Sequence, residues 1–222
     1  MHSVLEQFHL VQNKVNDIIG KKQLKTNPKT IVVTKTFSLE KIKPLLEIGH
    51  IHYGENKIQE AEEKWSEAKN NYKNIKLHMV GTLQSNKAKR AVKLFDYIHS
   101  LDNERLAIKL SQYQKEYNKK IKLFIQVNVT DDKKKSGVSL SLLNDFYNYC
   151  TKKLFLNVIG LMCLPPISSN PNQYFKLLEQ TATKLNLKEL SMGMSADYES
   201  AILHGSTYLR LGTLIMGKRK SI

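Results

Sequence analysis

A lysine closes an apolar run near the start of the chain, in the segment TIVVTKTFSL at residues 30–39. The β-branched residues before it are typical of a buried strand, and burying an ammonium group is costly unless a partner compensates the charge. Lys35 is therefore either a lysine whose stem reaches solvent from a strand end or an amine held in a site. Desolvation lowers the pKa of a lysine, and a neutral amine is a nucleophile.

Two segments near the other end of the chain have the composition of an anion site. SMGMSADYESAI (191–202) and YLRLGTLIMG (208–217) each run from a strand pattern through glycine into a helix pattern. Glycine lets a backbone approach a ligand closely, and N–H groups at a helix start attract anions. Ser195 is predicted to cap the first helix, and a capping motif alone would also explain the pattern. Together the segments favour a phosphate site. Its residues would be Gly193, Met194, Ser195, Gly212 and Thr213.

An arginine lies inside the last apolar run. Strand alternation puts Arg210 on the side of Tyr208 and Gly212, opposite Leu209 and Leu211. A guanidinium that points into a protein needs acceptors and stays charged. Arg210 can therefore form a structural salt bridge with a carboxylate, or it can donate to a ligand atom.

These features fit one cofactor. If the first and last strands are neighbours in a closed ring, Lys35 faces the phosphate site, and the nearby guanidinium would help to lower its pKa. An aldehyde-binding lysine, a phosphate site and an arginine that faces a ring together suggest pyridoxal phosphate held as a Schiff base.

The elements that must position these residues follow a strand–helix alternation. Eight strand patterns are separated by helical patterns, without hairpin signals, which predicts a parallel α/β fold. Eight strands favour a closed (β/α)8 TIM barrel with its active site at the carboxyl ends of the strands; the alternative, a doubly wound open sheet, usually has five or six strands. An amphipathic segment before the first strand predicts an extra N-terminal helix, and residues 1–222 are expected to form a single domain. The predicted strands are 30–34, 50–53, 76–80, 97–101, 121–129, 158–164, 189–192 and 207–211.

Four histidines raise the possibility of a metal site. His50 and His52 in GHIHYGEN are two apart on a predicted strand, which would put them on one face, and His78 and His99 lie on the next two strands. However, the pair lies at the start of its strand, away from the expected active end. We therefore expect no metal site, and histidines that are satisfied in the structure or half-exposed.

The composition limits the remaining classes. The net charge of +15 is compatible with a polyanion partner, but the basic residues are scattered and no nucleic-acid-binding motif accompanies them. No apolar stretch is long enough to span a bilayer, and the N-terminus lacks the pattern of a signal peptide. We expect a cytoplasmic monomer without specific nucleic-acid or membrane partners. Cys150 and Cys163 are expected to be buried.

Segments along nearly the whole chain resemble the pyridoxal phosphate homeostasis proteins, single-domain relatives of the N-terminal barrel of alanine racemase. They are VVTKT, HYGENKIQEAEEK, LHMVGTLQSNKAK, YIHSLD, QVNVTDDKKKSGVS, IGLMCLPP, LSMGMSADYESAI and YLRLGTLIMGKR. The sequence departs from the family's common residues at Thr34, at Thr82, where histidine is usual, and at Cys163–Leu164. The departure at Thr82 puts any histidine role at that position in doubt.

The resemblance implies roles for individual residues. Lys35 would carry the cofactor as an internal aldimine, and Arg210 would meet its pyridine nitrogen. Asn56, in the GEN segment, would contact the cofactor near its ring, and Lys135, in KKKSGV, would help to accept or release it. Ser195, Gly212 and Thr213 would hold the phosphate.

Two functions remain open. The first is a non-catalytic protein that buffers pyridoxal phosphate and delivers it to apoenzymes; the second is a weak amino-acid racemase. In the racemases an opposing tyrosine comes from a second domain after the barrel, which we expect to be absent because the sequence ends at GKRKSI. An arginine at the ring nitrogen also weakens the ring as an electron sink. These points favour the carrier.

Overall fold

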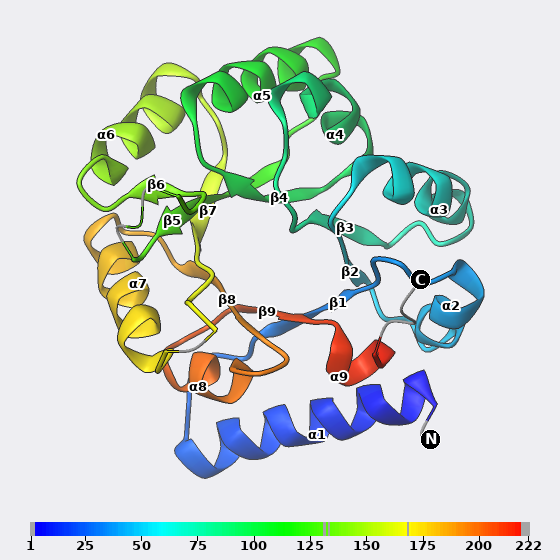
Figure 1. Cartoon of the computed structure of the whole chain (residues 1–222). Helices are drawn as coiled ribbons and strands as arrows, with labels where there is room; N and C mark the ends of the chain where they lie inside the picture. Colours follow the sequence, from blue (N-terminus) through cyan, green and yellow to red (C-terminus); the bar gives the residue numbers. More distant parts are fainter. Residues whose placement is uncertain (1–2, 131, 133, 168, 219–222) are drawn as a thin grey trace.

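The computed structural model describes residues 3–130, 132, 134–167 and 169–218. Among them, eight parallel strands close into a ring, and helices surround it (Figure 1). The strands of the ring are β1 (Lys29–Val33), β2 (His52–Glu55), β3 (Lys76–Met79), β4 (Tyr97–Leu101), β5 (Lys122–Asn128), β7 (Val158–Met162), β8 (Glu189–Met194) and β9 (Tyr208–Leu211). β4 pairs with β5, and β9 pairs with β1, which completes the closure. The predicted (β/α)8 barrel is confirmed, and the open sheet is wrong.

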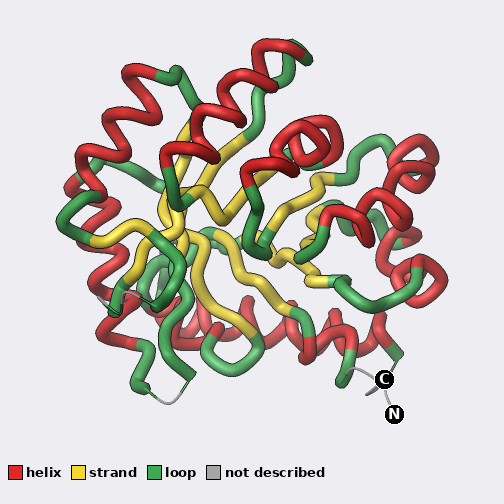
Figure 2. The backbone as a smooth tube through the Cα atoms, turned by 45° about the horizontal axis from the view of Figure 1, so that its top comes forward, coloured by secondary structure: helices red, strands yellow, loops and turns green. Residues whose placement is uncertain are grey.

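The helices lie outside the strands, as the red and yellow tubes of Figure 2 show. The helices are α1 (Val4–Lys22), α2 (Leu39–Glu47), α3 (Ile58–Asn71), α4 (Ala88–Leu94), α5 (Glu104–Glu116), α6 (Leu143–Asn148), α7 (Asn172–Lys184), α8 (Tyr198–Leu203) and α9 (Thr213–Met216). Shorter elements are the 3₁₀ turn η1 (Ser85–Lys87), the π-helix η2 (Tyr149–Lys153) and β6 (Val138–Ser139), which pairs with β5. The predicted N-terminal helix is α1. It contacts α2, α8 and α9, and so covers the part of the ring where the last helix has only 4 residues.

The main hydrophobic core lies between the outer faces of the strands and the helices. Trp65 of α3, Phe95 after α4 and Phe175 of α7 are fully buried there. Burial of one such side chain contributes about 1.5–3 kcal/mol. This layer holds the strand ends in fixed positions, and the strand ends carry the polar residues of interest.

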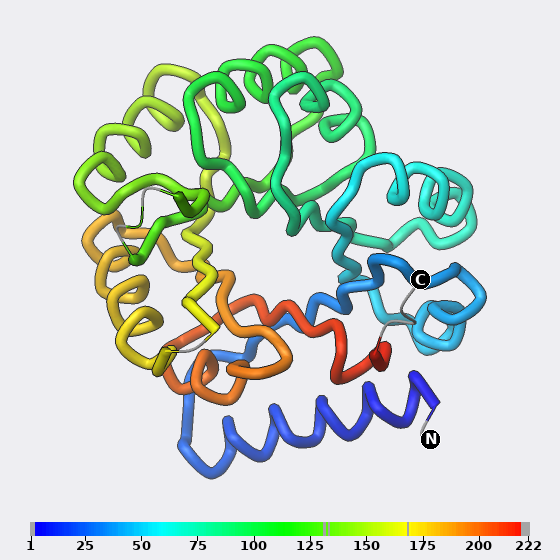
Figure 3. Tube along the Cα trace, in the orientation of Figure 1, coloured from blue at the N-terminus to red at the C-terminus, as the bar shows by residue number. Residues whose placement is uncertain are grey.

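Alternation along the strands fills the interior of the ring with a second set of side chains. Ile31, Tyr97, Phe124 and Tyr208 pack together inside the ring with Met162, whereas the neighbours of Arg210 on β9 belong to the outer core. The predicted orientation of Arg210 is therefore confirmed. Figure 3 follows the chain from its blue start to its red end and shows the first and last strands side by side. In their pairing, Ile31 is level with Arg210.

The described part of the chain contains no helix that is long and apolar enough to cross a membrane. Residues 219–222, at the end of the GKRKSI segment, lie outside the described residues.

Candidate functional site

A cavity of about 420 Å³ opens at the carboxyl ends of β1, β2, β8 and β9. Small-molecule sites in proteins usually have volumes of about 300–1,000 Å³. Seven of the nine predicted site residues line the cavity, and they come from four strand ends. They are Lys35, Asn56, Met194, Ser195, Arg210, Gly212 and Thr213.

Lys35 is held through its two neighbours in the chain. The Thr34 amide donates to the Gly54 carbonyl oxygen (2.9 Å), which extends the pairing of β1 with β2 by one residue. On the other side, the Thr36 amide donates to the Glu60 carboxylate. Thr36 has a φ of 69°, a conformation that a β-branched residue adopts only when its surroundings impose it. The turn that carries Lys35 is thus fixed at both sides of the lysine.

A buried carboxylate beneath α3 completes this anchorage. Glu55 is fully buried, and its Oε1 accepts hydrogen bonds from Thr34 Oγ1 (2.7 Å), Trp65 Nε1 (2.9 Å) and Lys64 Nζ (2.9 Å). Lys64 also donates to the Thr34 carbonyl oxygen (2.8 Å). Since β1 and β2 are adjacent, these bonds tie the end of β1 to the end of β2, and so hold the turn of Lys35 against the strand end that carries Asn56.

The position of Asn56 depends on a glycine of the next strand end. A Cβ built on Gly81 would lie 2.4 Å from the Asn56 carbonyl oxygen and 2.8 Å from its Cα. Both distances are shorter than real contacts, so only glycine lets the chain after β3 lie against the Asn56 backbone.

Arg210 is almost completely buried, with 5% of its surface exposed. Its Nη1 donates to Ser191 Oγ (2.7 Å) and its Nη2 to the Cys163 carbonyl oxygen (2.9 Å). Both partners are neutral, and the described residues form no salt bridge with Arg210. Burial lowers the pKa of Arg210, but an arginine starts so high that it stays protonated at neutral pH. The alternative of a structural salt bridge is therefore wrong, and a buried positive charge faces the cavity.

The hydroxyl and glycine residues form the wall of the cavity at the ends of β8 and β9. Ser195 Oγ accepts a hydrogen bond from the Leu214 amide (3.3 Å) and so links the turn after β8 to α9. The prediction that Ser195 caps a helix is wrong, because α8 starts only at Tyr198. The reason is a turn between strand and helix, in which Asp197 Oδ1 accepts from the Met194 amide (2.6 Å).

Gly193 supports this wall from outside the cavity. Its φ is +92°, and a Cβ there would lie 2.6 Å from Ala201 Cβ. The glycine therefore allows α8 to pack against β8, whereas its neighbour Met194 lines the cavity.

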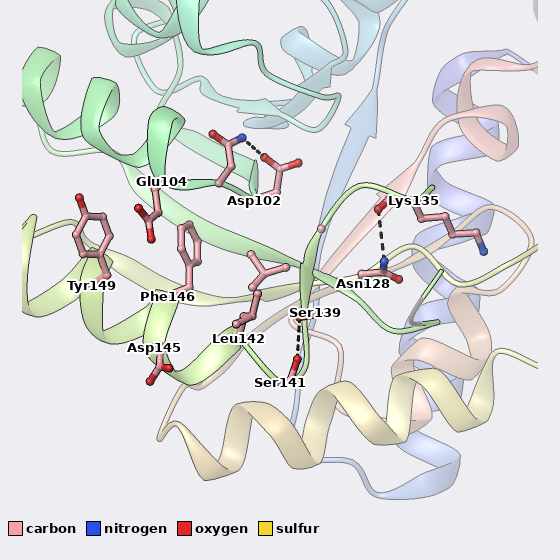
Figure 4. A pocket seen from close by; sticks show the side chains of 13 residues that line it. Asp102, Glu104, Asn128, Lys135, Ser139, Ser141, Leu142, Asp145, Phe146 and Tyr149 are labelled. Atoms are coloured by element: carbon pink, nitrogen blue, oxygen red, sulfur yellow. Dashed lines mark hydrogen bonds between the residues drawn. The ribbon is translucent and has the colours of Figure 1, made fainter. Parts of the chain in front are cut away.

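The remaining predicted residue, Lys135, lies elsewhere on the same rim. It borders a cavity of about 420 Å³ that shares Leu164 and Ile167 with the cavity of Lys35. It also borders a larger cavity of about 850 Å³ between α5 and α6. In Figure 4 the Lys135 side chain points away from Phe146 and Tyr149 of this larger cavity. The structure thus separates Lys135 from the other predicted residues by one cavity.

The four histidines do not share one face. β2 begins at His52, so the alternation does not extend to His50. The His50 ring contacts Phe8 of α1 (4.9 Å between centroids) outside the ring of strands, whereas His52 Nδ1 lies 2.9 Å from His78 Nε2 inside it. The prediction of one face is therefore wrong. No group of three or more metal-ligating side chains occurs among the described residues.

Both cysteines are buried, as predicted. Burial raises the pKa of each thiol to about 12, so neither is a nucleophile at neutral pH. Cys163 contributes to the site through its carbonyl oxygen alone.

Four residues that build the site were not predicted as site residues from the sequence: Glu55, Lys64, Gly81 and Ser191. Ser191 lies between Leu190 and Met192, whose apolar side chains belong to the outer core, so alternation could have placed it on the inner face with Arg210. Lys64 and Gly81 had no such signal, because a lysine on a helix and a glycine after a strand are common. Their roles depend on which elements meet in space.

Comparisons with known proteins identify the family of the chain. The sequence profile of the family described as "Alanine racemase, N-terminal domain" matches residues 17–220. A pyridoxal phosphate homeostasis protein of Synechocystis sp. is 38% identical over 198 residues, which cover 85% of this chain and 90% of that protein. A protein with the same description from Aquifex aeolicus is 35% identical over 201 residues, 86% of this chain and 87% of its own length.

Solved structures give the same result. PipY of Synechococcus elongatus, with pyridoxal phosphate bound, has a TM-score of 0.85 and 30% identity over 97% of this chain and 100% of its own. The alanine racemase of Clostridium difficile has a TM-score of 0.68 and 14% identity; the match covers 96% of this chain and 58% of the racemase, and it shows a common fold only.

Proposed function

The chain belongs to the pyridoxal phosphate homeostasis proteins of the alanine racemase N-terminal domain family, and from this premise we propose that it binds pyridoxal 5'-phosphate (PLP) reversibly. PLP is linked to Lys35 as a Schiff base in the cavity at the ends of β1, β2, β8 and β9. The chain buffers the cofactor, part of the vitamin B6 pool, and delivers it to PLP-dependent apoenzymes rather than using it in catalysis.

The residues of the cavity fit this cofactor. The observation that carries the proposal is the buried guanidinium of Arg210, whose hydrogen-bond partners are neutral and which lines the same cavity as Lys35. The Asp197 carboxylate acts on Arg210 electrostatically but forms no ion pair with it among the described residues. A buried charge whose hydrogen-bond partners are neutral favours a ligand that brings acceptor atoms. PLP supplies an aldehyde for a lysine amine, a ring nitrogen for Arg210 and a phosphate group.

Each of the nine predicted site residues has a role under this proposal. Ser195, Gly212 and Thr213, with their neighbour Met194, hold the phosphate at the ends of β8 and β9, while Gly193 keeps the turn in place. Asn56 contacts the cofactor near its ring. Lys135, one cavity away, accepts or releases PLP on its path between solvent and Lys35.

The ionisable groups of the cavity support a carrier. Among the described residues that line it, Lys35 and Arg210 are the only ionisable ones. Racemisation at a carbon needs a proton donor or acceptor on each face, and loss of one general acid or base typically costs about 10²–10⁴ in rate. The names of the relatives also describe homeostasis rather than a reaction.

We propose further that the chain acts in the cytoplasm as a monomer. Apart from Leu164 and Ile167, which share the loop after β7, its exposed large apolar residues lie on different elements, for example Leu10 on α1, Ile108 on α5 and Leu203 on α8. Scattered apolar residues are normal on a monomer. The basic residues that give the net charge of +15 then belong to a solvated surface without a polyanion partner. Binding to duplex or single-stranded nucleic acid at low salt that is lost with added salt would contradict this part.

The proposal is tested by adding PLP to the protein and recording the difference absorption spectrum, followed by borohydride reduction and peptide mapping. Wild type should gain an absorption band near the visible edge, and reduction should fix the label on Lys35. The variant Lys35→Met should lose both signals. Lys57→Met is the matched control, because this exposed lysine follows Asn56 but does not line the cavity. A label on another lysine would refute the assignment.

Arg210→Ala should weaken retention without abolishing the covalent link, because the lysine remains. Turnover of alanine and serine is measured on the same samples, with Lys35→Met as background. Lysine-dependent racemisation at ordinary enzyme rates would reject the carrier in favour of a racemase.

A further inference from the structure

A continuous chain of hydrogen bonds runs through the interior of the barrel to Arg210. His52 Nδ1 lies 2.9 Å from His78 Nε2, and His78 Nδ1 lies 2.9 Å from His99 Nε2. His99 Nδ1 lies 2.8 Å from Ser191 Oγ, which accepts from Arg210. Four adjacent bonds thus connect His52, at the amino end of β2, with the guanidinium at the cavity.

This interior is unusual for its fold, because bulky branched residues usually fill a barrel of this kind. Here the polar residues His78, His99 and Ser191 are fully buried. The ring of His78 stacks on Tyr97 (centroids 4.2 Å apart), and the ring of His99 stacks on Phe124 (4.4 Å). Buried polar groups are tolerated when every donor and acceptor is paired. The protons of this hydrogen-bond chain must therefore be arranged so that each bond has one donor and one acceptor.

Arg210 determines that arrangement. A guanidinium only donates, so Ser191 Oγ accepts from Arg210 and its own proton can go to His99 Nδ1. His99 then carries its proton on Nε2 and donates to His78 Nδ1, and His78 donates in the same way to His52 Nδ1. All three imidazoles are neutral, with the proton on Nε2.

The opposite direction leaves a group unpaired. If His99 Nδ1 donated to Ser191, the hydroxyl oxygen would receive two donors, and its proton would have no acceptor among the hydrogen bonds of the described residues. A buried donor without a partner costs about 1–3 kcal/mol. The geometry therefore favours one direction of hydrogen-bond donation, in which each group donates to the next one from the guanidinium towards the amino end of the barrel.

We propose that Ser191 and His99 are positioning residues for Arg210, and that the chain of three imidazoles, each with its proton on Nε2, keeps the hydroxyl of Ser191 turned so that it accepts from the guanidinium. The remaining N–H groups of Arg210 are thereby kept for the cavity. Which ligand atoms these N–H groups meet rests on the proposed function. The series of hydrogen bonds itself is present in the protein without ligand.

The end of the hydrogen-bond chain at His52 lies among charged groups. His52 is near Lys29, Lys76 and Lys122, and its ring contacts Tyr97 and Tyr208. Positive neighbours disfavour a charged imidazole, which supports the neutral state that the chain requires. At the other end, the cation of Arg210 acts on His99 in the same sense.

The first test measures the protons directly in the protein without PLP. Nitrogen-15 spectra of the imidazoles should show Nδ1 without a proton and Nε2 with one at His52, His78 and His99. Scalar couplings should appear across the bonds from His99 Nε2 to His78 Nδ1 and from His78 Nε2 to His52 Nδ1. A proton on Nδ1 of any of the three at neutral pH would overturn the proposal.

The second test separates positioning from packing. In His99→Asn the side-chain oxygen can still accept from Ser191, whereas His99→Phe keeps the ring but offers no acceptor; both lose the bond to His78. We expect the dissociation constant for PLP to rise about tenfold in the phenylalanine variant, equivalent to about 1.4 kcal/mol, and less than about threefold in the asparagine variant. Equal effects in the two variants, or none, would overturn the proposal.

Ser100→Ala provides the control for a buried hydroxyl, since Ser100 Oγ has no hydrogen-bond partner in the described structure and Ser100 adjoins His99 in the chain. This variant should leave the PLP affinity and the nitrogen-15 spectra of the three imidazoles unchanged, whereas Ser191→Ala should change both. If wild type failed to bind PLP, the proposed function would fail. The nitrogen spectra would still decide whether the hydrogen-bond chain of the three imidazoles has the proposed proton arrangement.

Discussion

Acid should destabilise this protein well before its carboxylates are protonated. Burial lowers the pKa of His50 and of His52 from the usual value of about 6.5 to about 4. The neutral form is thus favoured in the folded state, so the unfolded chain binds more protons at mildly acidic pH. The stabilisation is complete above about pH 7 and is lost as the pH falls from about 6.5 towards 4.

The size of the effect follows from these pKa values. At pH 5, His50 alone contributes a loss of about 2 kcal/mol in the free energy of unfolding. His52 is partly exposed and is discounted to about 1 kcal/mol. His78 and His99, whose pKa values burial also lowers, add to the loss. The total of at least about 3 kcal/mol is a large part of a typical stability of 5–15 kcal/mol.

Urea unfolding between about pH 7.5 and pH 5 measures this loss. Trp65, the single tryptophan, is fully buried and reports unfolding by fluorescence. Because the net charge of +15 adds general repulsion in acid, the series is repeated at about 0.5 M salt, which screens exposed charges but not buried ones.

A variant assigns the effect to one residue. His50 Nε2 contacts the His52 carbonyl oxygen (2.9 Å), and His50→Gln keeps a donor there but does not titrate. It should reduce the pH-dependent loss at pH 5 by about 2 kcal/mol, whereas His204→Gln, at the end of α8, serves as the control. An unfolding free energy that stayed constant from pH 7.5 to pH 5 in high salt would refute the reasoning.

Two further predictions concern the anchorage of the site. Gly81→Ala should force the Asn56 backbone to move, because the added Cβ would lie 2.4 Å from its carbonyl oxygen; we expect a loss of about 1–3 kcal/mol in stability and weaker PLP retention by absorption, and unchanged retention would contradict the role of this contact. Lys64→Met should cost about 3–5 kcal/mol in urea unfolding, because it leaves the buried Glu55 carboxylate without its cation. Lys43→Met, which removes an exposed pair with Glu47, should cost less than about 0.5 kcal/mol, and equal losses in the two variants would show that the buried pair is unimportant.

The sequence predicted the barrel because its signals are local and repeated. Eight short apolar runs separated by helical periods leave few topologies, and closure of the ring then makes β1 and β9 neighbours. That single consequence brought Lys35 and Arg210 to one cavity although 175 positions separate them in the chain. The side on which Arg210 lies also followed from alternation.

Features that depend on exact element ends were not predictable in this way. The cap assigned to Ser195 failed because a turn with Asp197 delays α8 by two residues. The prediction that His50 and His52 share one face failed because β2 begins only at the second histidine. One residue more or less at a strand end reverses the direction of a side chain, and sequence patterns do not fix strand ends to that accuracy.

The two charged groups of the cavity are held from opposite faces of the same sheet, and this division follows from the period of a strand. Lys35 is fixed through the backbone of its turn by Glu55 and Lys64, which lie beneath α3 on the outer face. Arg210 is fixed by Ser191 through its side chain on the inner face. Because the two networks share no residue, damage to one should leave the other intact, and their effects on PLP retention should add. Under the proposed function, a carrier gains from this separation, since the guanidinium can stay in place for the next cofactor while the proposed bond at Lys35 forms and breaks.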